Sequence, residues 1–249
     1  MVYAADSTPS SGGAFACKQL AEEKTDVGAW ITMAKSEVTL EPGTKEIIPF
    51  TILVPQNADT GEHNGCILVQ EKKAKVEGQT GAVLSVRTGL RVAITIPGEI
   101  TRQLQIVNFT ITPTKDGFLL HPLVRNVGNV SIDADVQVLT RYFFGLTYLK
   151  DGGQYPILRG DTSEWNFELK NPFWGGWYQS KFTVGYDQNK EAGIGIKSGK
   201  TLTQLTGPSI WFFSFPTPVA LVIEIMVILL ITFGGFLIQR TQKRKKRKN

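Results

Sequence analysis

Residues 104–139 read LQIVNFTITPTKDGFLLHPLVRNVGNVSIDADVQVL and contain three strand-like runs in succession. Each run is rich in β-branched and aromatic side chains, which fit a pleated, half-buried surface. The turn-forming pairs Asp116-Gly117 and Gly128-Asn129 separate the runs. Short strands with turns roughly every ten residues are typical of β-sandwiches. This stretch therefore predicts an all-β unit.

The same pattern extends in both directions along the chain. Further strand candidates are EWNFELK (164–170), YQSKFTVGY (178–186), KEIIPFTILVP (45–55), GCILVQ (65–70) and AVLSVRTGLRVAITIP (82–97). No stretch before residue 215 shows helical periodicity. A boundary near Gly98–Gln103 divides the chain into halves of about 100 residues, the size of an immunoglobulin-like domain. We therefore predict two tandem immunoglobulin-like β-sandwiches, at residues 1–99 and 100–210.

The last part of the chain has a different character. Residues Val219 to Ile238 form a nearly unbroken apolar run, long enough for a helix to cross the hydrocarbon core of a bilayer. Trp211, Phe212, Phe213 and Phe215 precede the run, and aromatic residues favour the membrane–water interface. The sequence predicts a single transmembrane helix at residues 216–239.

Most of the positive charge follows this helix. The cations of the tail are Arg240, Lys243, Arg244, Lys245, Lys246, Arg247 and Lys248. Subtracting these seven from the net charge of +5 leaves −2 for residues 1–239, which argues against a nucleic-acid partner. Positive residues stay on the cytoplasmic side of a membrane. The tail, residues 240–249, is therefore expected in the cytoplasm, where it can contact anionic lipid heads, and residues 1–215 are expected outside the cell.

The beginning of the chain does not match this topology. Export needs a signal peptide, but MVYAADSTPSSGGAFA has neither a basic segment nor an apolar one. The first half also has about five strand candidates where an immunoglobulin-like domain has about seven. We expect the chain to be a fragment whose natural N-terminus and first strands lie upstream of Met1.

The order of several short motifs resembles a known family. These are Trp30-Ile31-Thr32, Pro42-Gly43, Gly61-Glu62-His63 leading to Gly65, and RNVGNV at 125–130 before a single membrane helix with a basic end. Together they resemble the bacterial surface proteins related to the WxL-interacting proteins. The resemblance implies a membrane-anchored protein of a bacterial, Gram-positive-type envelope. Its first module would contact peptidoglycan, its second would bind surface proteins, and it carries over no catalytic residue.

Three aromatic residues are the best candidates for a binding site. Trp174, Trp177 and Tyr178 lie in NPFWGGWYQ, where Gly175-Gly176 is suited to a tight turn that exposes a ring. Exposed aromatic residues stack on sugars or anchor protein interfaces. The alternative is that these side chains fill the core of the sandwich.

Glu224 is the one ionisable residue inside the apolar run. A carboxyl group in a bilayer is costly and is often functional. It either pairs with a partner helix or reaches the nearby interface.

Other candidates for chemistry have simpler interpretations. Glu62-His63 is expected in a solvated turn, His121 is expected to be satisfied within a strand, and Asp133 with Asp135 is expected on a solvated strand face rather than in a calcium site. Two cysteines, Cys17 and Cys66, are too few to predict a disulfide framework, so two unpaired thiols are the favoured interpretation and a bridge is the alternative.

These observations predict a non-enzymatic binding or scaffold protein of the cell surface, with no catalytic residue, metal or cofactor. Its partners would be cell-wall polymer or surface proteins, together with membrane lipid. Two alternatives remain. One is a subunit of a membrane complex assembled through the transmembrane helix at Glu224, and the other is an envelope hydrolase.

Overall fold

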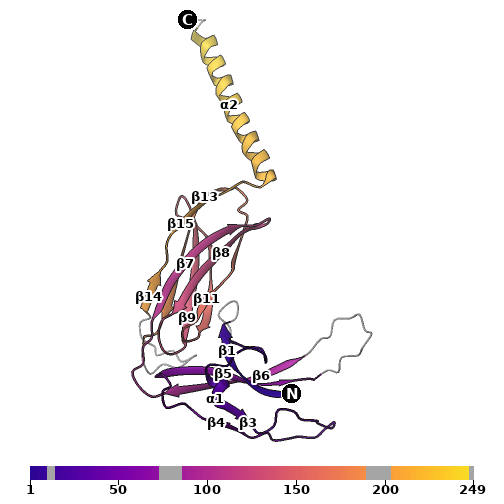
Figure 1. Ribbon diagram of the computed structural model, residues 1–249. Helices are drawn as coiled ribbons and strands as arrows, with labels where there is room; N and C mark the ends of the chain where they lie inside the picture. The colour runs from indigo at the N-terminus through magenta and orange to yellow at the C-terminus, as the bar shows by residue number, and fades with distance from the viewer. Residues whose placement is uncertain (10–14, 73–85, 189–202, 247–249) are drawn as a thin grey trace.

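The computed structural model describes residues 1–9, 15–72, 86–188 and 203–246, with the backbone alone for 241–246. Strands dominate two successive β units, and one long helix follows them at the C-terminus (Figure 1). The predicted β class is confirmed at this level.

The first unit is built on a four-stranded sheet in the order β2-β1-β5-β6. Its strands are β1 (Val2–Pro9), β2 (Phe15–Cys17), β5 (Gly61–Gln70) and β6 (Arg87–Ile96). One face packs against the short helix α1 (Val27–Trp30) and the pair β3 (Ile31–Met33) and β4 (Phe50–Ile52). The alternation of β1 explains this, because Val2 and Ala4 face that layer while Tyr3 and Ala5 face the other side.

The second unit has two sheets on opposite sides of one apolar core. One sheet contains β7 (Leu104–Pro113), β8 (Gly117–Asn126), β11 (Thr162–Glu164) and β12 (Phe167–Lys170), with β8 in the middle. The other sheet contains β9 (Ile132–Tyr142), β10 (Thr147–Ile157), β13 (Gly176–Tyr186), β14 (Thr203–Thr206) and β15 (Ile210–Ser214). Buried side chains from β8 and β12 meet those of β9 and β13.

The helix α2 (Pro218–Lys246) follows the second unit after a three-residue linker, 215–217. Its segment Pro218–Arg240 is long and apolar enough to cross a membrane, and none of its most apolar window is buried within the protein. The predicted helix is thus present. The expected orientation, like the immunoglobulin-like character of the units, stays a prediction.

Three local expectations were wrong. Residues 27–30 form a turn of helix although no helix was expected before residue 215, so Trp30 of the Trp30-Ile31-Thr32 motif ends α1 and only Ile31 and Thr32 lie in a strand. The run 45–55 forms a strand only at Phe50–Ile52, because Pro49 and Pro55 lack an N–H group and Ile47 is 91% exposed. The strand β15 belongs to the second unit, which therefore extends past residue 210 to Ser214. The first residues of the predicted strand 82–97, residues 82–85, lie outside the described parts.

The cysteines also differ from the favoured expectation. Cys17 and Cys66 form a disulfide, with their Cα atoms 6.1 Å apart. The strand pairing explains the contact, since β1 lies between β2 and β5 and pairs Ser7 with Cys17 and Ala5 with Cys66. The bridge joins two segments 49 residues apart on the face of the sheet that carries Tyr3 and Leu68.

Candidate functional site: a cleft between the units and an aromatic end face

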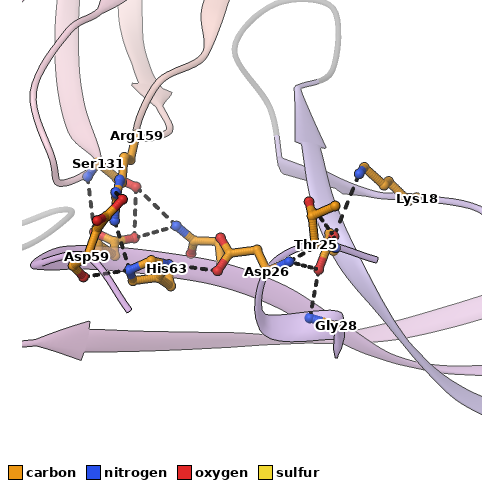
Figure 2. Close-up of polar contacts among 11 residues, drawn as sticks. Lys18, Thr25, Asp26, Gly28, Asp59, His63, Ser131 and Arg159 are labelled. Atoms are coloured by element: carbon orange, nitrogen blue, oxygen red, sulfur yellow. Dashed lines mark hydrogen bonds and ion pairs between the residues drawn. The ribbon is translucent and has the colours of Figure 1, made fainter. Parts of the chain in front are cut away.

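A buried carboxylate in the first unit holds the backbone around the start of α1 in place. Asp6, on β1, is 3% exposed and accepts hydrogen bonds from the N–H groups of Thr25 (2.6 Å) and Gly28 (2.7 Å). Lys18 lies 3.6 Å from it (Figure 2). These bonds satisfy backbone donors at the start of α1, where no intrahelical acceptor exists. The segment that carries Asp26 is thereby fixed.

His63 is the centre of a polar cluster between the two units. It lies on β5, is 7% exposed, and places Nδ1 2.6 Å from Asp26 Oδ1. Its Nε2 lies 2.8 Å from Nη1 of Arg159, a residue of the second unit, and 2.9 Å from the carbonyl oxygen of Asp59. In a neutral ring whose Nδ1–H donates to Asp26, Nε2 accepts from Arg159, because a guanidinium only donates. The Asp59 carbonyl oxygen only accepts, so it is then a close contact of Nε2 and not a second hydrogen bond. Figure 2 shows His63 between these partners.

Glu62 makes the second connection between the units. Its carboxylate accepts hydrogen bonds from the Ser131 N–H (3.1 Å) and hydroxyl (2.7 Å), across 69 residues of sequence. Arg91 approaches the same carboxylate at 2.8 Å. Charge-assisted bonds of this kind are stronger than neutral ones, and these are largely shielded from water. We call the contacts of Gly61, Glu62 and His63 with the second unit the joint.

The backbones also approach closely at the joint. Glu62 N–H donates to the Asn129 carbonyl oxygen at 2.7 Å. A Cβ on Gly61 would lie 2.0 Å from that same oxygen, and Gly61 has φ +114°. Only glycine fits both the conformation and the space. Asn129 belongs to the RNVGNV segment, and its side chain donates to the carbonyl oxygen of Glu99 (2.8 Å) and accepts from Thr101 N–H (2.8 Å).

A cleft of about 390 Å³ opens beside these contacts. It is mainly polar, with Trp30 as an aromatic wall, and both units line it. Its charged and amide side chains are Asp26, Asn57, Asp59, Glu62, His63, Asn64 and Arg159. Such a cleft offers donors, acceptors and an aromatic face to a polar ligand.

The contacts of His63 limit its use as a general base. A general base needs a free lone pair that faces the substrate. Both nitrogens of His63 have partners, at 2.6 Å and 2.8 Å. Within the described parts of the chain, no three His, Cys, Asp or Glu side chains lie close enough together to hold a metal ion.

The expectation for Glu62-His63 was wrong. Both residues lie on β5, not in a solvated turn, and His63 has an orienting carboxylate and a neighbouring cleft. Sequence reasoning missed Asp26 and Arg159, because they lie 37 and 96 residues away from His63. The other expectations need less change. His121, on β8, has Nδ1 2.6 Å from the side-chain oxygen Oδ1 of Asn166, and Asp133 and Asp135 are half-buried on β9.

The predicted aromatic binding residues separate into two groups. Trp174 and Trp177 are 51% and 54% exposed, whereas Tyr178 is fully buried in the core. Tyr178 alternates with Trp177 along β13, so the two rings face opposite sides of the sheet. Burial, together with a hydrogen bond to Tyr142, raises the pKa of the Tyr178 phenol far above its usual range. The prediction of Tyr178 as a binding residue was therefore wrong.

Exposed aromatic side chains collect at the end of the second unit that carries α2. The hairpin between β9 and β10 meets the start of β13 there, since Phe143 N–H donates to the Trp177 carbonyl oxygen at 2.9 Å. Trp177 pairs with Phe213 of β15. The aromatic end face consists of Phe143, Phe144, Trp174, Trp177, Trp211 and Phe213, all at least 42% exposed.

The remaining predicted residues lie on α2. Glu224 is half-exposed on the helix and forms no ion pair within the described residues. Arg240 is exposed, and Lys243–Lys246 continue the helix, whereas Arg247 and Lys248 lie outside the described residues.

Comparisons of the chain with family models, with curated proteins and with solved structures gave no match. The resemblance to WxL-interacting proteins therefore stays an expectation from sequence motifs.

Proposed function

We propose that this chain is a non-enzymatic, membrane-anchored binding or scaffold protein of a bacterial cell surface. The proposal rests above all on how α2 is attached. The helix starts directly after the second unit, and Thr217 N–H donates to the Phe173 carbonyl oxygen at 3.0 Å. An apolar helix fixed in this way holds the β units beside a membrane, with residues 1–215 outside the cell and the basic tail in the cytoplasm.

Two features support immunoglobulin-like units within this proposal. The second unit places β7, β8 and β11/β12 in one sheet and β10, β9, β13 and β14/β15 in the other, which is the division of strands found in sandwiches of this type. Tyr178, near the start of β13, donates its hydroxyl to the carbonyl oxygen of Gly175 at 3.2 Å. A tyrosine at this place with such a bond is a hallmark of the fold.

The ligand would occupy the cleft between the units. Its lining of carboxylates, two amides, a guanidinium and an indole ring suits the hydroxyl, amide and amine groups of cell-wall polymer or of a surface protein. The joint holds both walls of the cleft in place, so little ordering is needed when a ligand binds.

Retention on isolated Gram-positive cell walls and on extracted surface proteins tests this function. The full chain is reconstituted in lipid nanodiscs, and wild type is compared with the double variant Asn57→Ala, Asp59→Ala. Both residues line the cleft, and Asp59 is 82% exposed. We expect retention to fall about tenfold, as loss of two ligand hydrogen bonds predicts. Glu168→Ala, on an exposed site of β12, is the matched control and should retain full binding.

Failure of the wild-type chain to bind either preparation would overturn the proposed function. Turnover of a wall substrate by the chain would instead favour the hydrolase. Equal binding by wild type and the double variant would remove the cleft from the proposal.

A second candidate function rests on Glu224. A carboxyl group on an apolar helix, with no ion pair among the residues that the structure describes, suits a basic or polar group on another transmembrane helix. Under this alternative, the chain is a subunit of a membrane complex. Detergent pull-downs with Glu224→Leu test it, since unchanged partners would exclude a role for the carboxyl group.

A further inference from the structure

The short linker fixes the distance of the aromatic end face from the helix. Residues 215–217 are the only ones between β15 and α2. Three residues span at most about 10 Å, and the bond from Thr217 to Phe173 shortens the reach further. If α2 crosses a bilayer, the end face lies at the level of the lipid head groups, which extend roughly 5–8 Å beyond the hydrocarbon core.

The residues at that level are suited to an interface. Phe144 at the hairpin tip is 83% exposed, and Trp177 and Trp211 line an apolar hollow of about 320 Å³ with Phe143. Indole and phenyl rings favour the head-group region of a membrane. The other aromatic rings of the unit pack in its core. The rings of the aromatic end face are exposed instead, and an exposed apolar patch of this kind marks a site of contact with a membrane or a protein.

A cluster of positive charge lies next to the aromatic end face. On the outer face of the sheet β10-β9-β13, Arg141 pairs with Gln179 in the row beside Trp211. Lys150 and Lys181 flank Leu139 in the next row. A groove of about 260 Å³ runs among these three cations, and none of them forms an ion pair with a described residue.

The outer face of the opposite sheet of the same unit has no such excess of one sign. Its exposed acids, Glu164 of β11 and Glu168 of β12, are balanced by the exposed cations Arg125 of β8 and Lys170 of β12. An anionic lipid surface therefore attracts the first face more than the second. The nearest acidic groups on the cationic face, Asp133 and Asp135, lie further along β9, away from the hairpin.

We propose that the second unit leans onto an anionic lipid surface through the outer face of β10-β9-β13-β15. The aromatic end face enters the head-group region, and Arg141, Lys150 and Lys181 contact lipid phosphates. This inference rests on the membrane anchoring in the proposed function. Leaning sets the tilt of the whole extracellular part, because the joint ties the first unit to the second.

Two threonines provide a matched pair of probes for this orientation. Thr147 pairs with Arg141 on the cationic face, and Thr112 lies at the same end of the unit on the opposite sheet. Both are exposed. Each is changed to cysteine in the full chain, labelled with an environment-sensitive fluorophore, and reconstituted in phosphatidylglycerol nanodiscs that contain a head-group quencher. A third label at Leu229→Cys reports insertion of α2 through an acyl-chain quencher.

We expect strong quenching at Thr147 and little at Thr112. Lys150→Gln and Lys181→Gln should each lower the ratio of docked to free unit by up to about fivefold, and replacing phosphatidylglycerol by phosphatidylcholine should act in the same direction. Equal quenching at both threonines, with Leu229 quenched, would overturn the leaning and leave the anchor intact. An unquenched Leu229 would overturn the anchor and the leaning together. Quenching at Thr147 that is indifferent to lipid charge would refute the phosphate contacts.

Discussion

Replacement of Gly61 by alanine should open the joint. Residue 61 would keep φ near +114°, which costs about 1–3 kcal/mol for a residue with a Cβ. The new methyl group would also lie 2.0 Å from the Asn129 carbonyl oxygen, so the units must move apart. Movement breaks the bond from Glu62 N–H to Asn129, and an unpaired donor there costs about 1–3 kcal/mol. The total is about 4 kcal/mol.

Gly43→Ala is the matched control. Gly43 also has a positive φ, +79°, but nothing lies within 4 Å of its position for a Cβ. It should therefore cost only the backbone strain, about 1 kcal/mol. Of the difference of about 3 kcal/mol, about 2 kcal/mol is the lost contact between the units, and the rest is the larger backbone strain at φ +114°.

Two measurements follow the joint. Denaturant unfolding of the full chain gives the free energy of the first unit, and pulsed dipolar spectroscopy gives the distance between labels at Thr88→Cys and Glu168→Cys, one in each unit. We expect Gly61→Ala to broaden the distance distribution while Gly43→Ala leaves it narrow. The native cysteines are paired and take no label. Identical distances and stabilities in the two variants would refute the reasoning.

Three further predictions concern stability. Reducing the Cys17–Cys66 bridge should lower the unfolding free energy of the first unit by about 4 kcal/mol, because the bridge closes a loop of 49 residues. Cys17→Ser should cause the same loss in denaturant titrations, and an unchanged unfolding free energy would contradict this prediction. Asp6→Ala should cost about 3 kcal/mol, because it leaves several N–H groups near α1 unpaired, and hydrogen exchange at Gly28 should rise; unchanged exchange would argue against this role. Burial raises the pKa of Asp161 from 3.8 to about 6, so the folded state binds this proton more tightly than the unfolded state does. As the pH falls from 7 to 4, the contribution of Asp161 to the free energy of unfolding should therefore rise by about 1 kcal/mol, after allowance for solvent screening. Asp161→Asn should remove that part of the pH dependence, and an unchanged profile would exclude Asp161 as its source.

The second unit was easier to predict than the first. Its strands alternate regularly, because each sheet has one face in the core and one in water, and the run 104–139 produced β7, β8 and most of β9. Because adjacent residues of a strand face opposite sides of the sheet, Trp177 and Tyr178 could not both be exposed on one face. The buried position of Tyr178 could therefore have been predicted from the sequence. The run 45–55 has a similar composition, yet only three of its residues pair with another strand. The reason is that strand formation depends on the neighbouring strand as well as on the residue types.

The cleft could not be predicted from sequence patterns. Its contacts join His63 to Arg159 and Glu62 to Ser131 over long separations, and single polar residues carry no periodic signal. The segment RNVGNV did stand out by its Gly and Asn residues, and Asn129 within it is the residue on which the backbone contact depends.

The joint is polar, whereas each unit has an apolar interior, and this difference matters when the protein is pulled. Under the proposed function, the chain carries load between its ligand and its membrane helix. Hydrogen bonds at the joint exchange with water one at a time, but the sheets on either side must shear many bonds together. The joint therefore yields first under tension. The Cys17–Cys66 disulfide lies within the first unit and does not cross the joint, so the polar contacts at Asn129 can form again once the load is released.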